Sequence, residues 1–409
     1  MIGRRIEYKD PMKVTLSAKH AAIANQIGGS AATVASGVFL ANVLDPNAYG
    51  KYATAISLIT ILSIIPTAGI PQYLAAVAPK FMESGDRNAI VKLFSRTKIY
   101  MLLMCLLVAA GFVAFESFNN TYNLTGTTMV IISSAAICRT LLTHTTGKVN
   151  SLKNTNLSIL LQITLPQFFL LVISYILWQF GNMTYQSAVT AFTLSFFLSY
   201  QIGGRLAQRR IDKDIQFAKP GLASAKVEWR EIAPFSIVAI LSTINSEVAI
   251  QYSSIFEGAS STAQLRVALQ STSLLGIPII ALTTYYQPRF SHQYHSNRSQ
   301  LLRKTYIESA VTAAFISTPI LLMMAIWRFE ILSFLFGTEY REAATVLIII
   351  LTGFIPASLF GTAPAILMMT GRVGIVQLFL IVSLGLNVIA LIVLGEKFGL
   401  IGVAIAHAL

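Results

Sequence analysis

Long apolar stretches follow one another along the chain, and only short polar breaks separate them. Each of the first eleven is long enough to cross about 30 Å of hydrocarbon as an α-helix. Backbone groups in lipid must be satisfied within the segment, so helices are expected, and continuous runs do not match the alternating strands of an outer-membrane barrel. The pattern predicts an all-α integral membrane protein with about 12 transmembrane helices. The stretches are residues 20–44, 49–79, 98–117, 127–147, 155–179, 184–206, 231–256, 262–288, 305–327, 342–369, 373–394 and 398–409.

The last stretch is too short to span the membrane, so we expect a twelfth helix that is truncated at Leu409. Composition agrees with a membrane protein: 55% of residues are hydrophobic, only 11% are charged, and the mean hydropathy is +0.66. Soluble domains contain about 25% charged residues, and disordered chains are poor in apolar ones. An ordinary soluble enzyme and a disordered chain are therefore excluded.

Few sequence features indicate catalysis. Cys105 and Cys138 both lie in apolar stretches, which predicts small buried side chains rather than a disulfide framework or a metal cluster. The chain contains no P-loop and no H-E-x-x-H motif, so we expect no ATP-driven pump and no metal or other cofactor. Glu330, Glu339 and Glu342 form a solvated cluster on an expected outer loop. An enzyme is the weakest interpretation.

The net charge of +13 is distributed unevenly along the chain. When the N-terminus is placed in the cytoplasm, 25 of the 30 basic residues fall on the cytoplasmic side, in the N-terminal arm or in every second break, if Arg139 is counted with the inner end of the helix before the fourth break. Positive residues concentrate on the cytoplasmic side of membrane proteins, where they also meet anionic lipid. The distribution predicts a multi-pass protein of the bacterial inner membrane with a cytoplasmic N-terminus, and it removes the argument for nucleic-acid binding.

The longest and most basic break divides the predicted helices into six before it and six after it. Because six is even, both halves enter from the same side, and they are expected to be parallel repeats. Ala78–Phe81 and Gln287–Phe290 match at equivalent places, as do the outer turns 44–55 and 256–268. The predicted parts are a cytoplasmic arm (1–19), an N-terminal six-helix bundle (20–207), a basic cytoplasmic linker (208–230) and a C-terminal bundle (231–409).

Charged side chains inside the predicted membrane region need a partner or a water-filled cavity, because their burial in lipid costs at least about 2.5–3.5 kcal/mol. Arg139, Glu247 and Arg266 are the clear cases, and His144 is a weaker one near the cytoplasmic end of its helix. The first helices of the two halves also carry polar stripes at helical spacing. The polar residues expected to line a shared cavity are Asn25, Gln26, Thr33, Thr243 and Gln251.

Structural alternatives remain open for these residues. A stripe of small polar residues in a membrane helix often serves as a packing face. Glu247 and Arg266 can form an ion pair across the hairpin of the seventh and eighth helices. Arg266 can also extend to the outer interface, and His144 can be a buried structural residue.

Helix-breaking residues occur at equivalent places in the two halves. Pro66, Gly69 and Pro71 interrupt the second helix, and Gly276 and Pro278 interrupt the eighth. Proline removes a backbone hydrogen bond and kinks a helix. Paired interruptions are typical of transporters that rock one half against the other, so these residues are predicted to form gating kinks.

Several short motifs, in order along essentially the whole chain, resemble those of polysaccharide (O-antigen, Wzx-type) flippases of the multidrug/oligosaccharidyl-lipid/polysaccharide (MOP) exporter superfamily. They are Leu44–Tyr52, Gly69–Gln72, Leu265–Ala268 with Pro278, Gln287–Ser291, Phe336–Tyr340 with Ala343 and Ala344, Thr370–Arg372, Asn387 and Phe398–Ala406. The resemblance implies two six-helix bundles around a V-shaped cavity. It also implies transport of an undecaprenyl-pyrophosphate-linked oligosaccharide from the cytoplasmic to the periplasmic leaflet, by alternating access, for surface polysaccharide synthesis.

Physical chemistry agrees with such a lipid-linked oligosaccharide as the partner. Arginine pairs well with phosphate through its planar fork of donors, so Arg139 and Arg266 are expected to bind the pyrophosphate. Glu247 is the candidate for coupling to H⁺ or Na⁺, because a desolvated carboxylate can have a raised pKa. Membrane lipids and the polysaccharide polymerase or ligase machinery are the other expected partners.

Two other classes of function compete with this interpretation. A MATE-like exporter of drugs or metabolites, coupled to cations, would have acidic residues and few arginines within the membrane. The chain shows about one acid and two arginines there, which favours an anionic substrate. A scaffold for glycan-assembling enzymes would need neither buried charges nor paired kinks.

Overall fold

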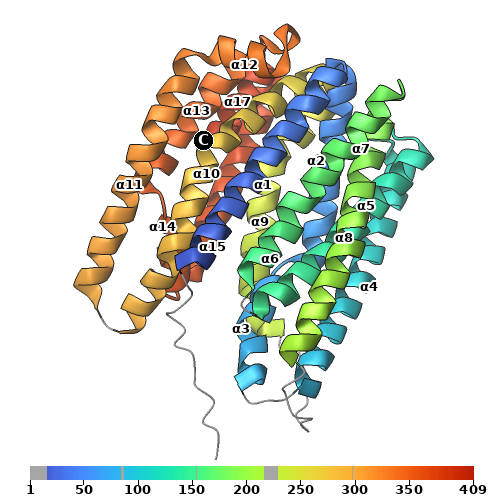
Figure 1. The fold of residues 1–409 in the computed structure, drawn as a ribbon. Helices are drawn as coiled ribbons and strands as arrows, with labels where there is room; N and C mark the ends of the chain where they lie inside the picture. Colours follow the sequence, from blue (N-terminus) through green and yellow to red (C-terminus); the bar gives the residue numbers. More distant parts are fainter. Residues whose placement is uncertain (1–15, 84–86, 153, 216–228, 297) are drawn as a thin grey trace, which may run out of the picture.

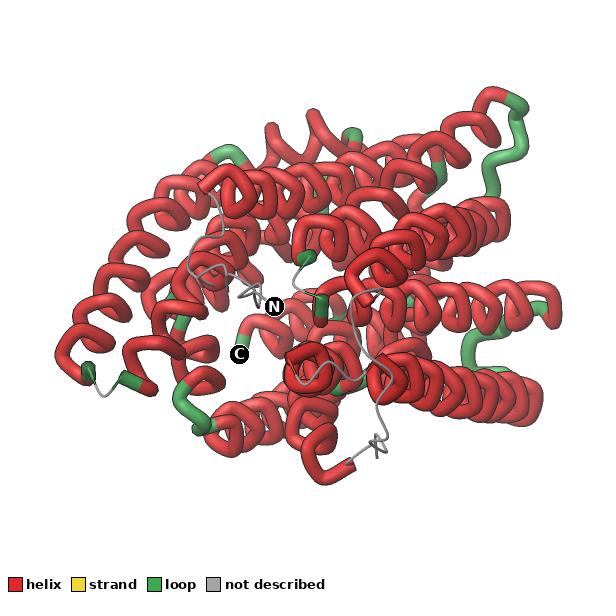
Figure 2. The backbone as a smooth tube through the Cα atoms, turned by 60° about the horizontal axis from the view of Figure 1, so that its bottom comes forward, coloured by secondary structure: helices red, strands yellow, loops and turns green. Residues whose placement is uncertain are grey.

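A computed structural model describes residues 16–83, 87–152, 154–215, 229–296 and 298–409. Most of the predicted N-terminal arm and of the basic linker lie outside these residues. Within the described ranges all regular structure is helical, as predicted, and Figure 2 shows the helices with the bottom of Figure 1 turned forward. Each of the twelve apolar stretches corresponds to one helix or to a pair of consecutive helices.

The first half of the molecule comprises the elements up to residue 215. Two of its apolar stretches are divided, one by the break between α2 and α3 and one by a π-helical turn, η1, between α6 and α7. The elements are α1 (Leu16–Val43), α2 (Pro46–Thr67), α3 (Ile70–Glu83), α4 (Arg87–Asn119), α5 (Gly126–Ser151), α6 (Thr155–Ile159), η1 (Leu160–Thr164), α7 (Leu165–Gln179) and α8 (Tyr185–Ile215).

The second half begins at Trp229 and also contains π-helical turns. Its elements are α9 (Trp229–Tyr252), η2 (Ser253–Glu257), α10 (Ala259–His295), α11 (Ser299–Ile326), α12 (Arg328–Phe336), the 3₁₀ turn η3 (Thr338–Tyr340), α13 (Ala343–Phe360), α14 (Ala363–Met369), α15 (Val373–Ala390), η4 (Leu391–Gly395), α16 (Glu396–Phe398) and α17 (Leu400–Ala408).

Nine helical stretches of the described chain are long and apolar enough to cross a membrane, judged by length and composition. The expected spans 20–44 and 184–206 are helical too, within α1 and α8, but neither is among these nine. Their composition explains the difference, because α1 carries the predicted polar stripe and the part of α8 before its basic end contains many Ser, Thr, Tyr and Gln residues. Many large apolar side chains are exposed on α4, α11 and α15, among them Leu107, Phe315 and Phe379, as expected for surfaces that face lipid.

The helix breaks agree with the prediction in the first half but not in the second. The chain leaves the helix at Ala68 and Gly69, where Gly69 has a φ of +73° that disfavours residues with a Cβ. In contrast, α10 continues without a break through Gly276 and Pro278, so the expectation that they interrupt it is wrong. A long helix tolerates the loss of the one backbone hydrogen bond that proline removes, provided that the neighbouring turns are intact. The second half breaks instead at Gly361, between α13 and α14.

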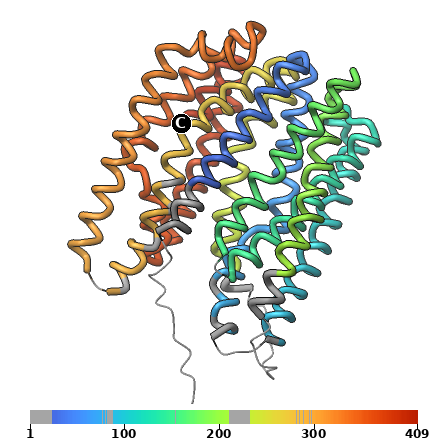
Figure 3. Tube along the Cα trace, viewed as in Figure 1, coloured from blue at the N-terminus to red at the C-terminus, as the bar shows by residue number. Residues whose placement is uncertain are grey.

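The two halves lie side by side, and α1 lies at the boundary between them, next to α10 (Figures 1 and 3). The C-terminal ends of α3, α8 and α10 lie at one end of the bundle, which we call the inner end. The turns that join α1 to α2 and α9 to α10 lie at the opposite, outer end. The predicted cytoplasmic breaks therefore lie at the inner end. That the inner end faces the cytoplasm is a prediction from the charge distribution.

Apolar packing joins the halves most tightly at the outer end. The larger buried cluster includes Tyr49 of α2, Leu265 of α10 and Tyr340 of η3. A Cβ added at Gly50 would overlap the carbonyl oxygen of Ala259, so glycine permits direct backbone contact between α2 and α10. A smaller cluster, with Leu74 and Leu93, packs α3 against α4 at the inner end. The cavity described below lies between these two packed regions.

Candidate functional site

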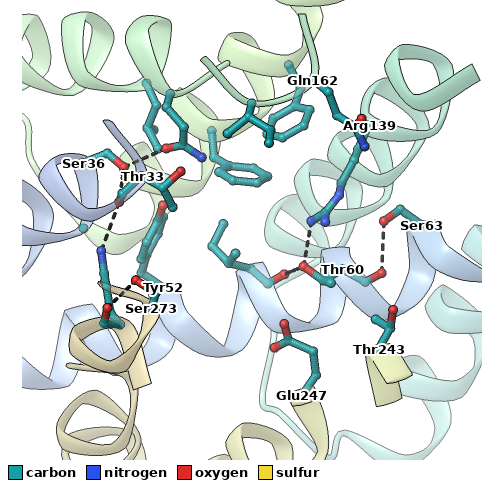
Figure 4. A pocket seen from close by; sticks show the side chains of 18 of the residues that line it. Thr33, Ser36, Tyr52, Thr60, Ser63, Arg139, Gln162, Thr243, Glu247 and Ser273 are labelled. Atoms are coloured by element: carbon teal, nitrogen blue, oxygen red, sulfur yellow. Dashed lines mark hydrogen bonds between the residues drawn. The ribbon is translucent and has the colours of Figure 1, made fainter. Parts of the chain in front are cut away.

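A central cavity of about 530 Å³ lies between the two halves (Figure 4). Helices α1, α2, α5, α7 and α8 and the turn η1 contribute to its wall from the first half, and α9 and α10 contribute from the second. Its polar lining comes mainly from hydroxyl and amide side chains. They are Thr33, Ser36, Thr60, Ser63, Thr67, Thr143, Gln162, Gln167, Thr243, Gln270 and Ser273.

All three charged residues singled out from the sequence line this cavity. Arg139 comes from α5, Glu247 from α9 and Arg266 from α10. They are the only charged residues among the described lining, so the cavity holds two positive charges and one carboxylate. Electrostatic interactions in such a confined space are stronger than in water, and the imbalance favours an anionic ligand.

Arg139 is held in the cavity by α2 and α8. Its Nη1 donates a hydrogen bond to Thr60 Oγ1 at 2.7 Å, and its guanidinium carbon lies 5.9 Å from the centre of the Phe196 ring. Thr60 Oγ1 in turn donates to the carbonyl of Ile56 at 2.8 Å. The hydrogen bond and the ring contact fix the direction of the side chain, and among the described residues the guanidinium makes no other hydrogen bond.

Glu247 extends from α9 toward α2, into the same region as Arg139 (Figure 4). Its Oε2 atom is buried, and in the described part of the chain it has no hydrogen-bond partner. No ion pair joins Glu247 to Arg266 among the described residues, contrary to the hairpin alternative. A buried carboxylate oxygen without a donor is costly, which is typical of a site that exchanges a proton, a cation or a ligand.

Gln270 connects three helices at the outer side of the cavity. Its amide nitrogen donates to the carbonyls of Thr33 and Val34 at 3.1 and 3.2 Å, and its Oε1 accepts from the Tyr49 hydroxyl at 3.0 Å. Gly37 on α1 provides the space, because a Cβ there would overlap the Gln270 amide. The network joins α10 of the second half to α1 and α2 of the first.

The structure brings only part of the predicted polar lining into the central cavity. Thr33 and Thr243 line it, whereas Asn25 lines a separate hollow at the inner end, and Gln26 lines neither. Gln251 is buried outside the cavity, and both atoms of its amide lack a hydrogen-bond partner among the described residues. These residues diverge because the packing of α1 and α9 decides which part of each polar stripe faces the cavity.

His144 does not belong to the cavity. It is 2% exposed, and its Nε2 lies 3.0 Å from Thr97 Oγ1 on α4. The side chain therefore points from α5 toward α4. This contact fits the structural alternative for His144.

The sequence pattern did not lead us to predict several of the residues that line the cavity. Thr60, Ser63 and Thr67 follow one another at helical spacing along α2, so the polar stripe itself was a usable signal. Gln162 and Gln167 gave no such signal. Gln162 lies within the π-helical turn η1, and Gln167 lies after it, in α7. A π-helical turn changes the phase of a helix, so a regular period of 3.6 residues fails across it.

Comparison with known proteins shows which fold this helix arrangement resembles. The family model described as MatE matches residues 234–393. No curated protein matches the chain. The lipid II flippase MurJ in an inward closed conformation aligns with a TM-score of 0.70 and 14% identity, over 96% of this chain and 84% of that one.

Two further solved structures are similar over nearly their whole length. An inward-facing multidrug resistance MATE family transporter of the MOP superfamily has a TM-score of 0.65 and 14% identity, over 95% of this chain and 94% of that one. A MOP superfamily transporter from Pyrococcus furiosus, described as having a binding pocket of reverse polarity, has a TM-score of 0.66 and 14% identity, over 96% and 91%. The chain therefore has the helical fold of MOP superfamily transporters.

Proposed function

We propose that this protein is a flippase that moves an oligosaccharide carried on undecaprenyl pyrophosphate from the cytoplasmic to the periplasmic leaflet, for synthesis of O-antigen or a related surface polysaccharide. The observation that carries the proposal is the central cavity, in which Arg139 and Arg266 outnumber the carboxylate of Glu247. The motifs that resemble Wzx-type flippases and the fold shared with a lipid II flippase support it.

The pyrophosphate is the part of this cargo that most needs the protein, because its negative charge makes direct passage through lipid prohibitive. Arg139 and Arg266 would bind it with charge-assisted hydrogen bonds from their planar donor forks. The hydroxyl and amide groups of the same cavity would bind the sugar. Thr33 and Thr243, among others, supply such groups.

Transport by alternating access requires the halves to separate first at one end and then at the other. At the outer end, Gln270 and Gly50 lie at the contacts that would have to part. The break at Ala68 and Gly69 gives α2 and α3 a point about which to move relative to each other. Pro66 and Pro71 flank this break, so we retain them as gating residues; for Gly276 and Pro278 the gating role is a proposal about bending within a continuous helix.

Energy for accumulation would come from H⁺ or Na⁺ exchange at Glu247. Glu247 lines the same cavity as the two arginines, and its buried Oε2 has no hydrogen-bond partner in the part of the chain that the structure describes. Protonation or cation binding would cancel the negative charge and thereby raise the affinity of the cavity for an anion. The released cargo would pass to the polymerase or ligase that consumes it.

The test replaces the two arginines in cells that depend on this protein for surface polysaccharide. We expect the Arg139→Ala and Arg266→Ala variants to lose at least about 90% of the polymer, because the loss of one buried charged hydrogen bond costs about 1.5–3 kcal/mol. Lipid-linked units should accumulate on the cytoplasmic face, and the lysine variants should restore part of the polymer. Polymer is quantified by gel, and membrane levels of each variant by immunoblot.

Arg303→Ala is the matched control, because Arg303 is an exposed residue of α11 outside the cavity. It should leave polymer unchanged. Normal polymer in a strain that lacks the whole protein would refute the proposed function. Normal polymer in both alanine variants at wild-type abundance would refute the assignment of the arginines.

A second candidate function is export of drugs or metabolites by cation antiport. The MatE match over residues 234–393 and the similarity to MATE transporters favour it specifically, and Glu247 would then be the cation site. The two arginines count against a cationic substrate. Increased resistance to cationic drugs on overexpression, lost in Glu247→Gln, would support this candidate over the flippase.

A further inference from the structure

A second hollow, of about 570 Å³, lies at the inner end of the first half. We call it the inner hollow. None of its described lining residues also lines the central cavity, so it is a separate space. Its wall comes from α1, from α6 with the residue before it, from η1 and from α8. The lining residues are Asn25, Asn154, Asn156, Leu157, Leu160, Leu206 and Arg209.

Two glycine contacts explain where the inner hollow begins. Gly29 of α1 packs so closely against Ile163 and Thr164 that a Cβ would overlap the Ile163 side chain. Gly203 of α8 packs in the same way against Leu161, so α1, η1 and α8 are in close contact at this level. The lining residues of α1 and α8 lie in the first two turns inward of these glycines, where larger side chains separate the elements. The hollow therefore widens toward the inner end.

The face of α8 at the inner hollow changes from apolar to basic toward the inner end. Ile202, Leu206 and Arg209 follow one another at spacings of four and three residues, so they share this face. Ile202 and Leu206 are exposed apolar side chains, and Arg209 is an exposed cation beyond them. Arg205, one turn before Arg209, is exposed as well. A phospholipid in the inner leaflet has the same order, with acyl chains followed by a phosphate.

Asparagine side chains make up the rest of the polar lining. Asn25 comes from α1 and Asn156 from α6, and Asn154 lies directly before α6, where its Oδ1 accepts from the Leu157 N–H at 3.3 Å. The amide nitrogen of asparagine can donate hydrogen bonds to phosphate oxygens. The described lining contains no aspartate or glutamate, so Arg209 gives it a positive charge that attracts an anion.

We propose that the inner hollow binds an anionic phospholipid, represented by phosphatidylglycerol, with its phosphate at Arg209 and the asparagine amides. The acyl chains lie against Leu157, Leu160 and Leu206. Basic pockets between helices at the cytoplasmic side of membrane proteins bind anionic lipid head groups, and the inner end is the end predicted to face the cytoplasm. The bound lipid holds α1 against α6 and α8. This site is separate from the central cavity and does not depend on the proposed function.

Photolabelling of the purified full-length protein in detergent tests the site. The probe is phosphatidylglycerol with a diazirine on the acyl carbons nearest the glycerol. We expect it to label peptides that contain Leu157 and Leu160, or Ile202 and Leu206, as identified by mass spectrometry. A phosphatidylcholine with the same diazirine should label these peptides at least about fivefold less, because its head group carries no net charge for Arg209 to attract. Equal labelling by the two probes would make the inner hollow a general lipid contact and overturn the inference.

Competition distinguishes a phospholipid from other anions. Unlabelled phosphatidylglycerol should displace the probe, whereas glycerol phosphate at the same concentration should not, because it lacks the acyl chains that the leucines bind. Displacement by glycerol phosphate would show a site for a soluble anion. Displacement by polyprenyl pyrophosphate at a lower concentration than phosphatidylglycerol would assign the hollow to that pyrophosphate instead. Either result contradicts the inference.

Two matched pairs of variants test the charged and the apolar part of the site by native mass spectrometry. Arg209→Gln should weaken phosphatidylglycerol binding about fivefold, whereas Arg303→Gln, exposed near the start of α11, should not. Leu206→Trp fills the hollow and should weaken binding to a similar extent. Leu194→Trp should not, because Leu194 lies on α8 outside the lining and is 43% exposed, against 44% for Leu206.

The outcomes of these pairs are distinct. Equal losses in the two arginine variants would show general attraction to a basic surface and refute the site. Wild-type binding by both Arg209→Gln and Leu206→Trp would refute it as well. The photolabelling arm uses the unmodified protein, so it remains decisive if a variant fails to fold.

Discussion

A charged residue in an apolar stretch indicates a polar site, and three residues illustrate this: Arg139, Arg266 and Glu247. A charge in an apolar stretch is expensive, and all three residues lie in one cavity. Glu116 is an instructive comparison: it is fully buried, and its Oε1 accepts hydrogen bonds from the backbone N–H groups of Tyr122 and Leu124, at 2.9 and 3.4 Å, whereas its Oε2, like that of Glu247, has no hydrogen-bond partner among the described residues. Its role is to hold the turn after α4.

Glu247→Gln tests the role of the Glu247 carboxylate, whose Oε2 has no hydrogen-bond partner among the described residues. The change keeps the shape of the side chain and removes its charge, so we expect affinity for pyrophosphate to be kept or increased. The transport rate should fall at least about tenfold and lose its dependence on pH or Na⁺, because the exchangeable site is gone. Transport is measured in vesicles across a pH series with and without Na⁺.

Glu330→Gln is the control for this prediction, because Glu330 is exposed on α12, outside the central cavity. It should behave like the wild type. A Glu247→Gln protein that transports at the wild-type rate with unchanged ion dependence would rule out the coupling role.

At the scale of elements, α2 and α10 hold the outer end together. They occupy equivalent places in the two halves, and their backbones meet at Gly50 and Ala259. One helical turn further along α2, Thr54 Oγ1 donates to Ser254 Oγ of η2 at 2.8 Å. These contacts link the outer turns that the sequence aligns with each other, and they would have to open in any outward-facing state.

A cysteine pair at Thr54 and Ser254 tests that movement. In a background with Cys105 and Cys138 replaced by alanine, we expect Thr54→Cys/Ser254→Cys to form a disulfide under mild oxidation, because the two hydroxyl oxygens are in contact. The disulfide should stop transport, and reduction should restore it, as measured in vesicles. Each single cysteine variant is the control, and undiminished transport by the oxidised pair would show that the outer end need not open.

At the scale of the whole molecule, the distribution of basic residues and the arrangement of helices give one topology. The helix ends next to the basic breaks gather at the inner end, and the α1–α2 and α9–α10 turns gather at the outer end (Figure 1). Positive residues remain preferentially on the cytoplasmic side. We therefore expect the central cavity to load from the cytoplasm.

Cysteine labelling in intact cells tests this orientation. In the cysteine-free background, Asn120→Cys, in the turn after α4, should react with a membrane-impermeant maleimide added outside. Ser299→Cys, at the start of α11, should react only after permeabilisation. The opposite pattern would invert the topology, and equal labelling at both positions would indicate leaky cells.

The sequence by itself determined the helical fold, the order of the helices and the presence of three charges within the membrane, because the burial of apolar segments and the cost of buried charge are local properties of the chain. Only the tertiary structure decided which polar side chains share the cavity. Helix rotation depends on close contacts such as Gly37 with Gln270, and the π-helical turn η1 shifts the phase of its neighbours. Gln270 therefore faces the cavity while Gln251 does not, although both lie in polar stretches of their helices.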